Sequence, residues 1–131
     1  MQVVYPIDIE DALRTDLAAL DTDYRFFAPP IPPDLRAGDV LITRVGGARV
    51  SGASHDHDVS VDCYGSDECD AALMANDVHG LFASLPLQAT QTQYSNANAN
   101  LPYQNNDPRA PQLARQTFRA TVTCPGKRIE F

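Results

Sequence analysis

The sequence has no long hydrophobic run and almost no lysine. No stretch of eighteen apolar residues occurs, so no membrane-spanning helix is predicted. The segment Met1 to Pro6 has neither a basic region nor an apolar core, and we therefore expect no signal peptide. Lys127 is the one lysine, and the net charge is −7. A general nucleic-acid binder needs clustered cations, so this charge argues against that class.

Cysteine is also scarce. The three cysteines, Cys63, Cys69 and Cys124, are an odd number without metal-like spacing. They predict no disulfide framework and fit a reducing compartment such as the cytoplasm. A Cys63–Cys124 bridge remains an alternative if their strands are neighbours. Cys69 lies near the start of a predicted helix, where a thiolate is stabilised. No histidine is near it in sequence to act as the base that a nucleophile requires.

Histidine occurs three times, and two of the three fall in the run His55-Asp56-His57-Asp58. Two histidines two residues apart on a strand share a face and are candidate metal ligands. A catalytic metal site needs three converging ligands, and His79 lies far along a predicted helix. The other interpretation is a solvated turn, Ser54 to Asp56, that leads into a strand. We expect no enzyme, no catalytic residue and no cofactor. A small metal-binding protein or enzyme using His55 and His57 is the alternative.

Two amphipathic helices are predicted. The first runs from Ile7 to Ala19, with apolar residues spaced by three and four and acidic residues in its first turn, which the helix dipole favours. The second starts after Ser66 as N-cap and is ended by Pro86. Its apolar residues have the clearest periodicity in the chain. They are Ala71, Met74, Ala75, Val78, Leu81, Phe82 and Leu85.

Several strands are predicted between and after these helices. The run from Asp39 to Val45 is rich in β-branched residues, and Gly46-Gly47 predicts a hairpin turn into Ala48 to Val50. Alternation from His57 to Tyr64 predicts a half-buried strand. The polar run from Leu87 to Tyr94 is assigned to an edge strand, and Ser95 to Ala110 to a long surface loop. A last alternating strand runs from Arg115 to Cys124.

The segment from Phe26 to Pro33 contains four prolines, so it is neither helix nor central strand. Phe26, Phe27 and Ile31 are expected to attach it to the core. The element order predicts a single α+β domain over residues 1–131. We expect a mainly antiparallel sheet of three to five strands with two helices packed on one face. The buried strand face should meet the apolar stripe of the second helix, which pairs Val59, Val61 and Cys63 with Met74, Val78 and Leu81.

A resemblance to a known family extends over nearly the whole chain. It rests on four segments: the strand end Arg44-Val45-Gly46-Gly47, the strand from Val59 to Gly65, the alanine-rich helix from Ala71 to Phe82, and Asn106-Asp107-Pro108 followed by Arg115 to Val122. In this order and residue type, the sequence resembles the tail terminator (tail completion) proteins of long-tailed bacteriophages, particularly those of actinobacterial hosts. Other neck components, such as head-completion stoppers and connector adaptors, have similar size and composition and remain an alternative.

The resemblance implies a structural virion protein without catalytic residues. Copies of the chain would form a ring, commonly hexameric, that caps the tail tube and joins the tail to the head. Its partners would be other copies, the tail tube protein and a head-completion or connector protein. Genomic DNA would pass through the lumen without specific binding. The protein would be found in the virion, and in the host cytoplasm during assembly.

The charge pattern adds an expectation about the contacts between subunits. Arg44 and Arg49 flank Gly46-Gly47, whereas Asp58 and Asp62 lie on the polar face of the next strand. We expect the two arginines of one subunit to lie opposite these carboxylates on a neighbour. Complementary charges repeated around a ring chiefly fix orientation and exclude wrong partners.

Overall fold

The computed structural model describes residues 1–130. The elements in chain order are β1 (Gln2–Tyr5), α1 (Ile9–Leu20), β2 (Arg25–Phe27), β3 (Asp39–Arg49), β4 (Ser54–Gly65), α2 (Glu68–Ser84), the 3-10 turn η1 (Leu85–Leu87), β5 (Asn96–Ala99), β6 (Tyr103–Gln104), β7 (Ala114–Pro125) and β8 (Lys127–Glu130). Neither helix in this part of the chain is long and apolar enough to cross a membrane.

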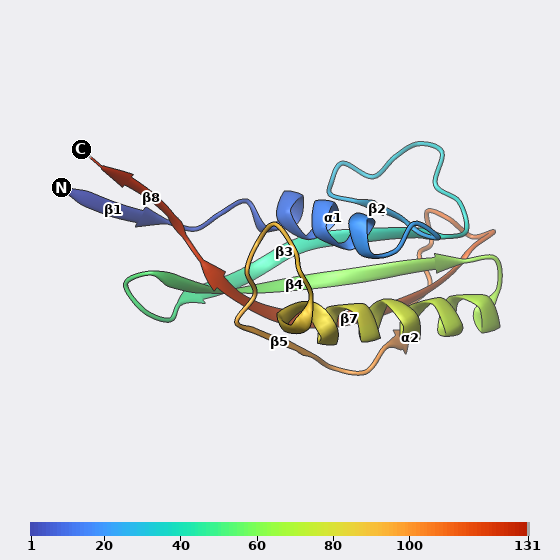
Figure 1. Cartoon of the computed structure of the whole chain (residues 1–131). Coiled ribbons are helices and arrows are strands. Elements are labelled where there is room, and N and C mark those ends of the chain that lie inside the picture. Colours follow the sequence, from blue (N-terminus) through green and yellow to red (C-terminus); the bar gives the residue numbers. More distant parts are fainter. Residues whose placement is uncertain (131) are drawn as a thin grey trace.

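Six strands form one sheet in the order β2-β3-β4-β7-β5, and β6 pairs with β7 beside β5. The long strands β3, β4 and β7 are antiparallel, whereas the short β2 runs parallel to β3. Both α1 and α2 cover the same face, α1 over β3 and α2 over β4 and β7 (Figure 1). The predicted α+β fold is therefore confirmed, with one strand more than the expected maximum of five.

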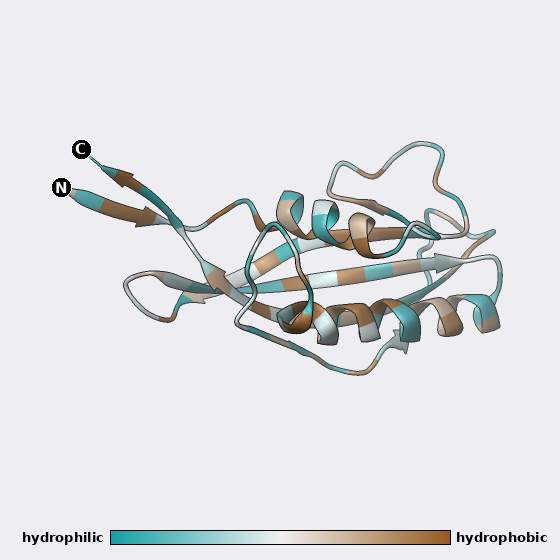
Figure 2. Ribbon diagram, viewed as in Figure 1, coloured by the Kyte–Doolittle hydropathy of each residue, from teal (hydrophilic) through white to brown (hydrophobic). Residues whose placement is uncertain are grey.

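The core lies between this sheet face and the two helices. Val59, Val61 and Cys63 of β4 are buried in one cluster with Met74 and Val78 of α2. Leu81 packs against the same cluster, as the matching periodicities predicted. From α1 the cluster receives Ile9, Leu13 and Leu17. In Figure 2, hydrophobic and hydrophilic colours alternate along the second half of β4, because alternate side chains face the helices and the open face.

The Gly46-Gly47 pair is not a hairpin turn. Both residues lie inside β3, beside a β-bulge at which the register shifts between Arg44 and Gly46. Gly47 has φ +153°, and a Cβ atom there would lie 2.3 Å from the Asp56 carbonyl oxygen, so glycine allows the two backbones to approach. The hairpin turn comes later, where the amides of Val50 and Ser51 both donate to the Ser54 carbonyl.

The predicted edge strand at residues 87–94 is also wrong. The backbone amides of Gln91 and Thr92 donate to the buried Asp16 carboxylate of α1, at 3.0 and 3.4 Å, rather than to a strand. The hydroxyl of Tyr94 donates to the same carboxylate at 2.8 Å. This anchor fixes the segment to the helix and leaves the free edge of β7 available. That edge is occupied by β5 and β6, two short strands within the predicted loop at residues 95–110.

The proline-rich segment and residues 105–113 cover one end of the opposite sheet face. Leu41 and Tyr64 are buried there, with Phe27 and Ile31 packed against them. Phe26 joins the main core, so all three expected anchors are confirmed. The segment is also held by Arg25, whose Nε and Nη2 donate to the buried Asp39 carboxylate at 2.8 and 2.7 Å. Such a two-point pair fixes geometry as well as contributing energy.

The two ends of the described chain form a separate two-stranded ribbon. β1 and β8 pair antiparallel from Gln2 opposite Glu130 to Tyr5 opposite Lys127. The ribbon projects beyond the helices and the main sheet (Figure 1), and all four residues of β8 are exposed. Gly126 lies at its base, where a Cβ atom would lie 2.4 Å from the Tyr5 carbonyl oxygen. The sequence did not predict this ribbon.

The cysteines show no bridge. Cys63 and Cys124 do lie on the neighbouring strands β4 and β7, but Cys63 is opposite Gln116 and Cys124 is opposite His55. They are therefore at opposite ends of the ladder, and all three cysteines are free. Burial raises the pKa of the Cys63 thiol and raises that of Cys124 to about 11. Both remain protonated thiols at neutral pH, whereas Cys69 is exposed in the first turn of α2.

Candidate functional site

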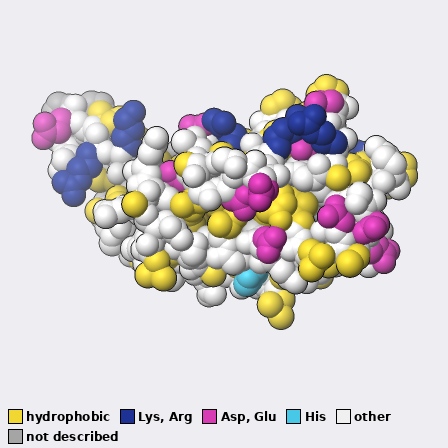
Figure 3. Space-filling view, turned by 45° about the vertical axis from the view of Figure 1, so that its right-hand side comes forward, with side chains coloured by type: hydrophobic (Ala, Val, Ile, Leu, Met, Phe, Trp, Pro, Cys, Tyr) yellow, Lys and Arg dark blue, Asp and Glu magenta, His cyan; other side chains and the backbone are white. Residues whose placement is uncertain are grey.

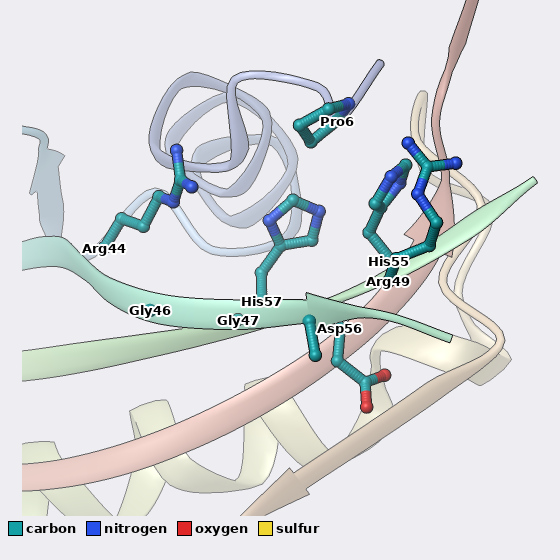
Figure 4. Close-up of a pocket in the computed structure, with 9 residues that line it drawn as sticks. Pro6, Arg44, Gly46, Gly47, Arg49, His55, Asp56 and His57 are labelled. Atoms are coloured by element: carbon teal, nitrogen blue, oxygen red, sulfur yellow. The ribbon is translucent and has the colours of Figure 1, made fainter. Parts of the chain in front are cut away.

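The most distinctive site is a pocket of about 240 Å³ at the end of the sheet nearest the terminal ribbon. β3 contributes Arg44 and Arg49 to its lining, β4 contributes His55 and His57, and Pro6 closes it from the segment before α1 (Figure 4). Both histidine rings and both guanidinium groups point to the helix side of the sheet. Four nitrogen-rich side chains thus line one hollow of a protein whose net charge is −7.

The bulge in β3 is what puts the two arginines on the same face of the sheet. Before the bulge, Val40, Ile42 and Arg44 face the helices, as alternation along a strand requires. The extra residue shifts this alternation by one, so Gly47 and Arg49 face the helices after it. A regular strand would place residues 44 and 49 on opposite faces. Sequence reasoning missed the pocket because it interpreted Gly46-Gly47 as a turn.

The histidines are buried without hydrogen-bond partners. The exposed fraction is 5% for His55 and 2% for His57, and their ring centroids are 6.2 Å apart. Nδ1 and Nε2 of His55 and Nε2 of His57 have no partner among the described residues. A buried polar atom without a partner carries a desolvation cost, which a ligand bonded to these nitrogens would remove. The predicted solvated turn at residues 54–56 is wrong, because His55 lies inside β4.

The two arginines differ in their contacts. Nη2 of Arg49 donates to the Val4 carbonyl of the ribbon at 2.9 Å, and Nη1 donates to Gly52 at 3.3 Å, so Arg49 braces the ribbon against the β3–β4 turn. Arg44 is exposed, and its backbone amide donates to Glu10 of α1 at 2.8 Å. No hydrogen bond or ion pair involves its guanidinium within residues 1–130.

The electrostatic environment opposes protonation of His57. Burial lowers the pKa of His57, and the neighbouring His55 and Arg44 lower it further. Asp56 and Asp58 act in the opposite direction. The Asp56 side chain points away from the pocket in Figure 4, so the hollow itself contains no carboxylate to balance its cations.

A metal ion does not fit this set of residues. No group of three His, Cys, Asp or Glu side chains able to hold a metal occurs in the described part of the chain. His79 does not lie near the other two histidines in the fold. It packs edge-on against Phe118 on the core side of β7, with the two ring centroids 5.4 Å apart. Two arginines beside the histidine pair would also repel a cation.

The opposite face of β4 carries a row of acidic side chains. The hydroxyls of Thr117 and Thr121 on β7 donate to Asp62 and Asp58 at 2.7 and 2.6 Å, and Thr123 donates to Asp56. The carboxylates are thereby held in fixed positions on a sheet face that neither helix covers. Arg44 and Arg49 lie on the helix face and Asp58 and Asp62 on this one, so these predicted interface residues do not meet within one chain.

Comparison of the chain with protein-family models gave no match, and comparison with curated proteins gave none either.

Proposed function

We propose that this chain is a structural subunit of a bacteriophage neck. Copies of it assemble into a ring, and the family resemblance implies that this ring has six subunits. The ring caps the tail tube and connects the tail to the head. The observation that carries the proposal is the terminal ribbon, because it projects from the domain and is paired only with itself among the described residues. A protruding ribbon whose edges pair with no further strand of the described residues is a means of joining one subunit to the next.

The composition of the ribbon supports this use. An isolated two-stranded ribbon is marginally stable in water, so an additional contact would stabilise it. It carries the hydrophobic residues Val3, Val4 and Ile129, visible as brown segments in Figure 2. It also carries Lys127 and Arg128, and Figure 3 shows basic side chains on this projection. With two basic residues against the one acidic residue Glu130, β8 is complementary in charge to the acidic row on β4 of another copy.

The charge of the chain is compatible with a lumen that conducts DNA. A subunit with a net charge of −7 does not retain a polyanion by counterion release. The expected contact of Arg44 and Arg49 with Asp58 and Asp62 of a neighbour remains a prediction. The structure adds a requirement to it, because one subunit would have to present its helix face to the open sheet face of the next.

Native mass spectrometry at several protein concentrations, with and without tail tube protein, tests the proposal. We expect a discrete ring that binds the end of the tube. A monomer at every concentration, with no complex with tube protein, would contradict it. A ring that binds only a connector or a head-completion protein would instead identify another neck component.

The subunit contact can be tested in the same experiment. Arg49→Glu should weaken the ring, and Asp58→Arg on the partner should partly restore it if the two residues meet. Arg49 also braces the ribbon through Val4, so loss of the ring without any restoration would assign its effect to the brace.

A further inference from the structure

The geometry points to a binding site for one oxyanion group, a carboxylate or a phosphate, in the pocket formed by Arg44, Arg49, His55 and His57. This inference goes beyond ring formation and does not depend on it. Two guanidinium groups and two imidazoles line the pocket side by side, whereas the carboxylate of Asp56, which also lines it, points away from the hollow (Figure 4).

The two histidines have unused hydrogen-bonding capacity. His55 and His57 are almost wholly buried, yet three of their ring nitrogens lack a partner within residues 1–130. An oxyanion accepts several hydrogen bonds at once, and bonds from charged donors are stronger than neutral ones. The Arg44 guanidinium is unengaged at the edge of the same pocket. Its planar fork suits both carboxylate and phosphate oxygens.

The pocket is also rigidly constructed. Gly47 lies opposite His57, and the bulge beside it sets the direction of both arginines. His55 is covered by Gly126, where a Cβ atom would lie 2.8 Å from His55 Cε1. Arg49 is fixed by its bonds to Val4 and Gly52. Because these groups are held before a ligand arrives, little ordering is needed on binding.

Binding should take up protons. The charged groups around the histidines are Arg44 and Arg49 on β3, Glu10 near Arg44 on α1, and Asp56 and Asp58 on the far face of β4. Cys124 of β7 is opposite His55 and is a neutral thiol at neutral pH. An anion in the pocket would offset the cationic repulsion and raise the pKa of His57. For a simple carboxylate, whose charge does not change over this range, binding should therefore be tighter at about pH 5.5 than at about pH 8.

The test is a titration of the whole chain with inorganic phosphate and, separately, with citrate at constant ionic strength, followed by NMR of the histidine ring protons. We expect saturable shifts of the His55 and His57 signals. Arg44→Gln should weaken binding by about tenfold or more, because a charge-assisted donor is lost. Arg119→Gln is the matched control, since Arg119 is an exposed arginine of β7 on the opposite sheet face. The Arg119→Gln variant should bind phosphate and citrate as tightly as the unmodified chain does.

A second experiment, a dilution series without added anion, distinguishes a free anion from a carboxylate supplied by another copy of the chain. If a neighbour supplies the group, the same histidine shifts will appear as protein concentration rises without added anion, and phosphate will compete with them. Shifts that require added phosphate or citrate identify a free ligand. Either outcome supports the site, provided that Arg44→Gln removes the shifts. Absence of shifts in both experiments, or equal shifts in the Arg44→Gln and Arg119→Gln variants, would overturn it.

Discussion

At the scale of single residues, buried carboxylates hold the irregular segments in place. Asp107 is 4% exposed and accepts hydrogen bonds from the Tyr64 hydroxyl at 3.0 Å and from Arg109 Nε at 3.1 Å. Arg115 Nη1 lies 3.4 Å from Oδ2 of Asp107. Burial opposes the ionisation of Asp107, but the hydrogen bonds of Arg109 and Tyr64 and the charge of Arg115 outweigh it and lower its pKa to about 2. The folded state therefore binds this proton more weakly than the unfolded chain.

This pKa predicts an acid-dependent loss of stability. The contribution of Asp107 is present above its ordinary value of 3.8 and is lost as the pH falls toward about 2. We expect Asp107→Asn to have a lower free energy of unfolding than the unmodified chain at pH 5. This difference in free energy should shrink by about 1–2 kcal/mol as the pH falls toward about 2. Urea unfolding at a series of pH values measures it. Asp23→Asn, at an exposed position, is the control. A difference independent of pH would show that ionisation of Asp107 is not involved.

At the scale of elements, the regular periodicities were sufficient to predict α1, α2, β4 and β7. A period of two in β4 and a period near 3.6 in α2 are local properties of the sequence. The N-cap of α2 is Asp67, whose side chain accepts from the amide of Asp70, whereas Ser66 donates to the Asp70 carboxylate. This error of one residue is ordinary for a helix end.

The elements that were missed depend on distant partners. Asn96–Ala99 has the composition of a loop, since asparagine is depleted in strands, but it pairs with β7 because that edge is otherwise open. Asp16 gives residues 91 and 92 an alternative to strand pairing, and no local pattern reveals a contact between residues so distant in sequence. The pocket was missed for the same reason. It depends on a bulge, and the bulge depends on the approach of β4 to Gly47.

The packing of α2 on β4 gives the prediction at this scale. Val78 is fully buried in the core, so Val78→Asp would place an unpaired charge in an apolar environment. We expect a loss of about 4 kcal/mol or more, which is a large part of the roughly 5–15 kcal/mol by which domains are stable and would unfold one at the lower end of that range. Leu73→Asp is the matched control, because Leu73 lies on the same helix and is 64% exposed. Circular dichroism melting compares the two. An unchanged melting temperature for Val78→Asp would mean that the register of the helix on the sheet is wrong.

At the scale of the whole molecule, folding and assembly use different surfaces. The main core includes no residue of β1 or β8, so the ribbon is not required for burial of the core. The acidic row of β4 likewise lies on a face that the helices leave open. Substitutions in the ribbon should therefore affect association more than stability. This separation allows the proposed assembly to be tested without unfolding the domain.

Ile129→Asp provides that test. Ile129 is 37% exposed and pairs with Val3, so an aspartate there removes a hydrophobic contact of the ribbon and places negative charge beside Glu130. It also weakens the attraction between the basic ribbon and an acidic neighbour. We expect the melting temperature to change little and the ring to dissociate at concentrations at which the unmodified chain remains assembled. Leu87→Asp, an 89% exposed leucine distant from the ribbon in the chain, is the control and should retain the ring. Native mass spectrometry measures the subunit number of both variants. If Ile129→Asp assembles as well as Leu87→Asp does, the ribbon is not the subunit contact, and the open face of β4 becomes the next surface to test.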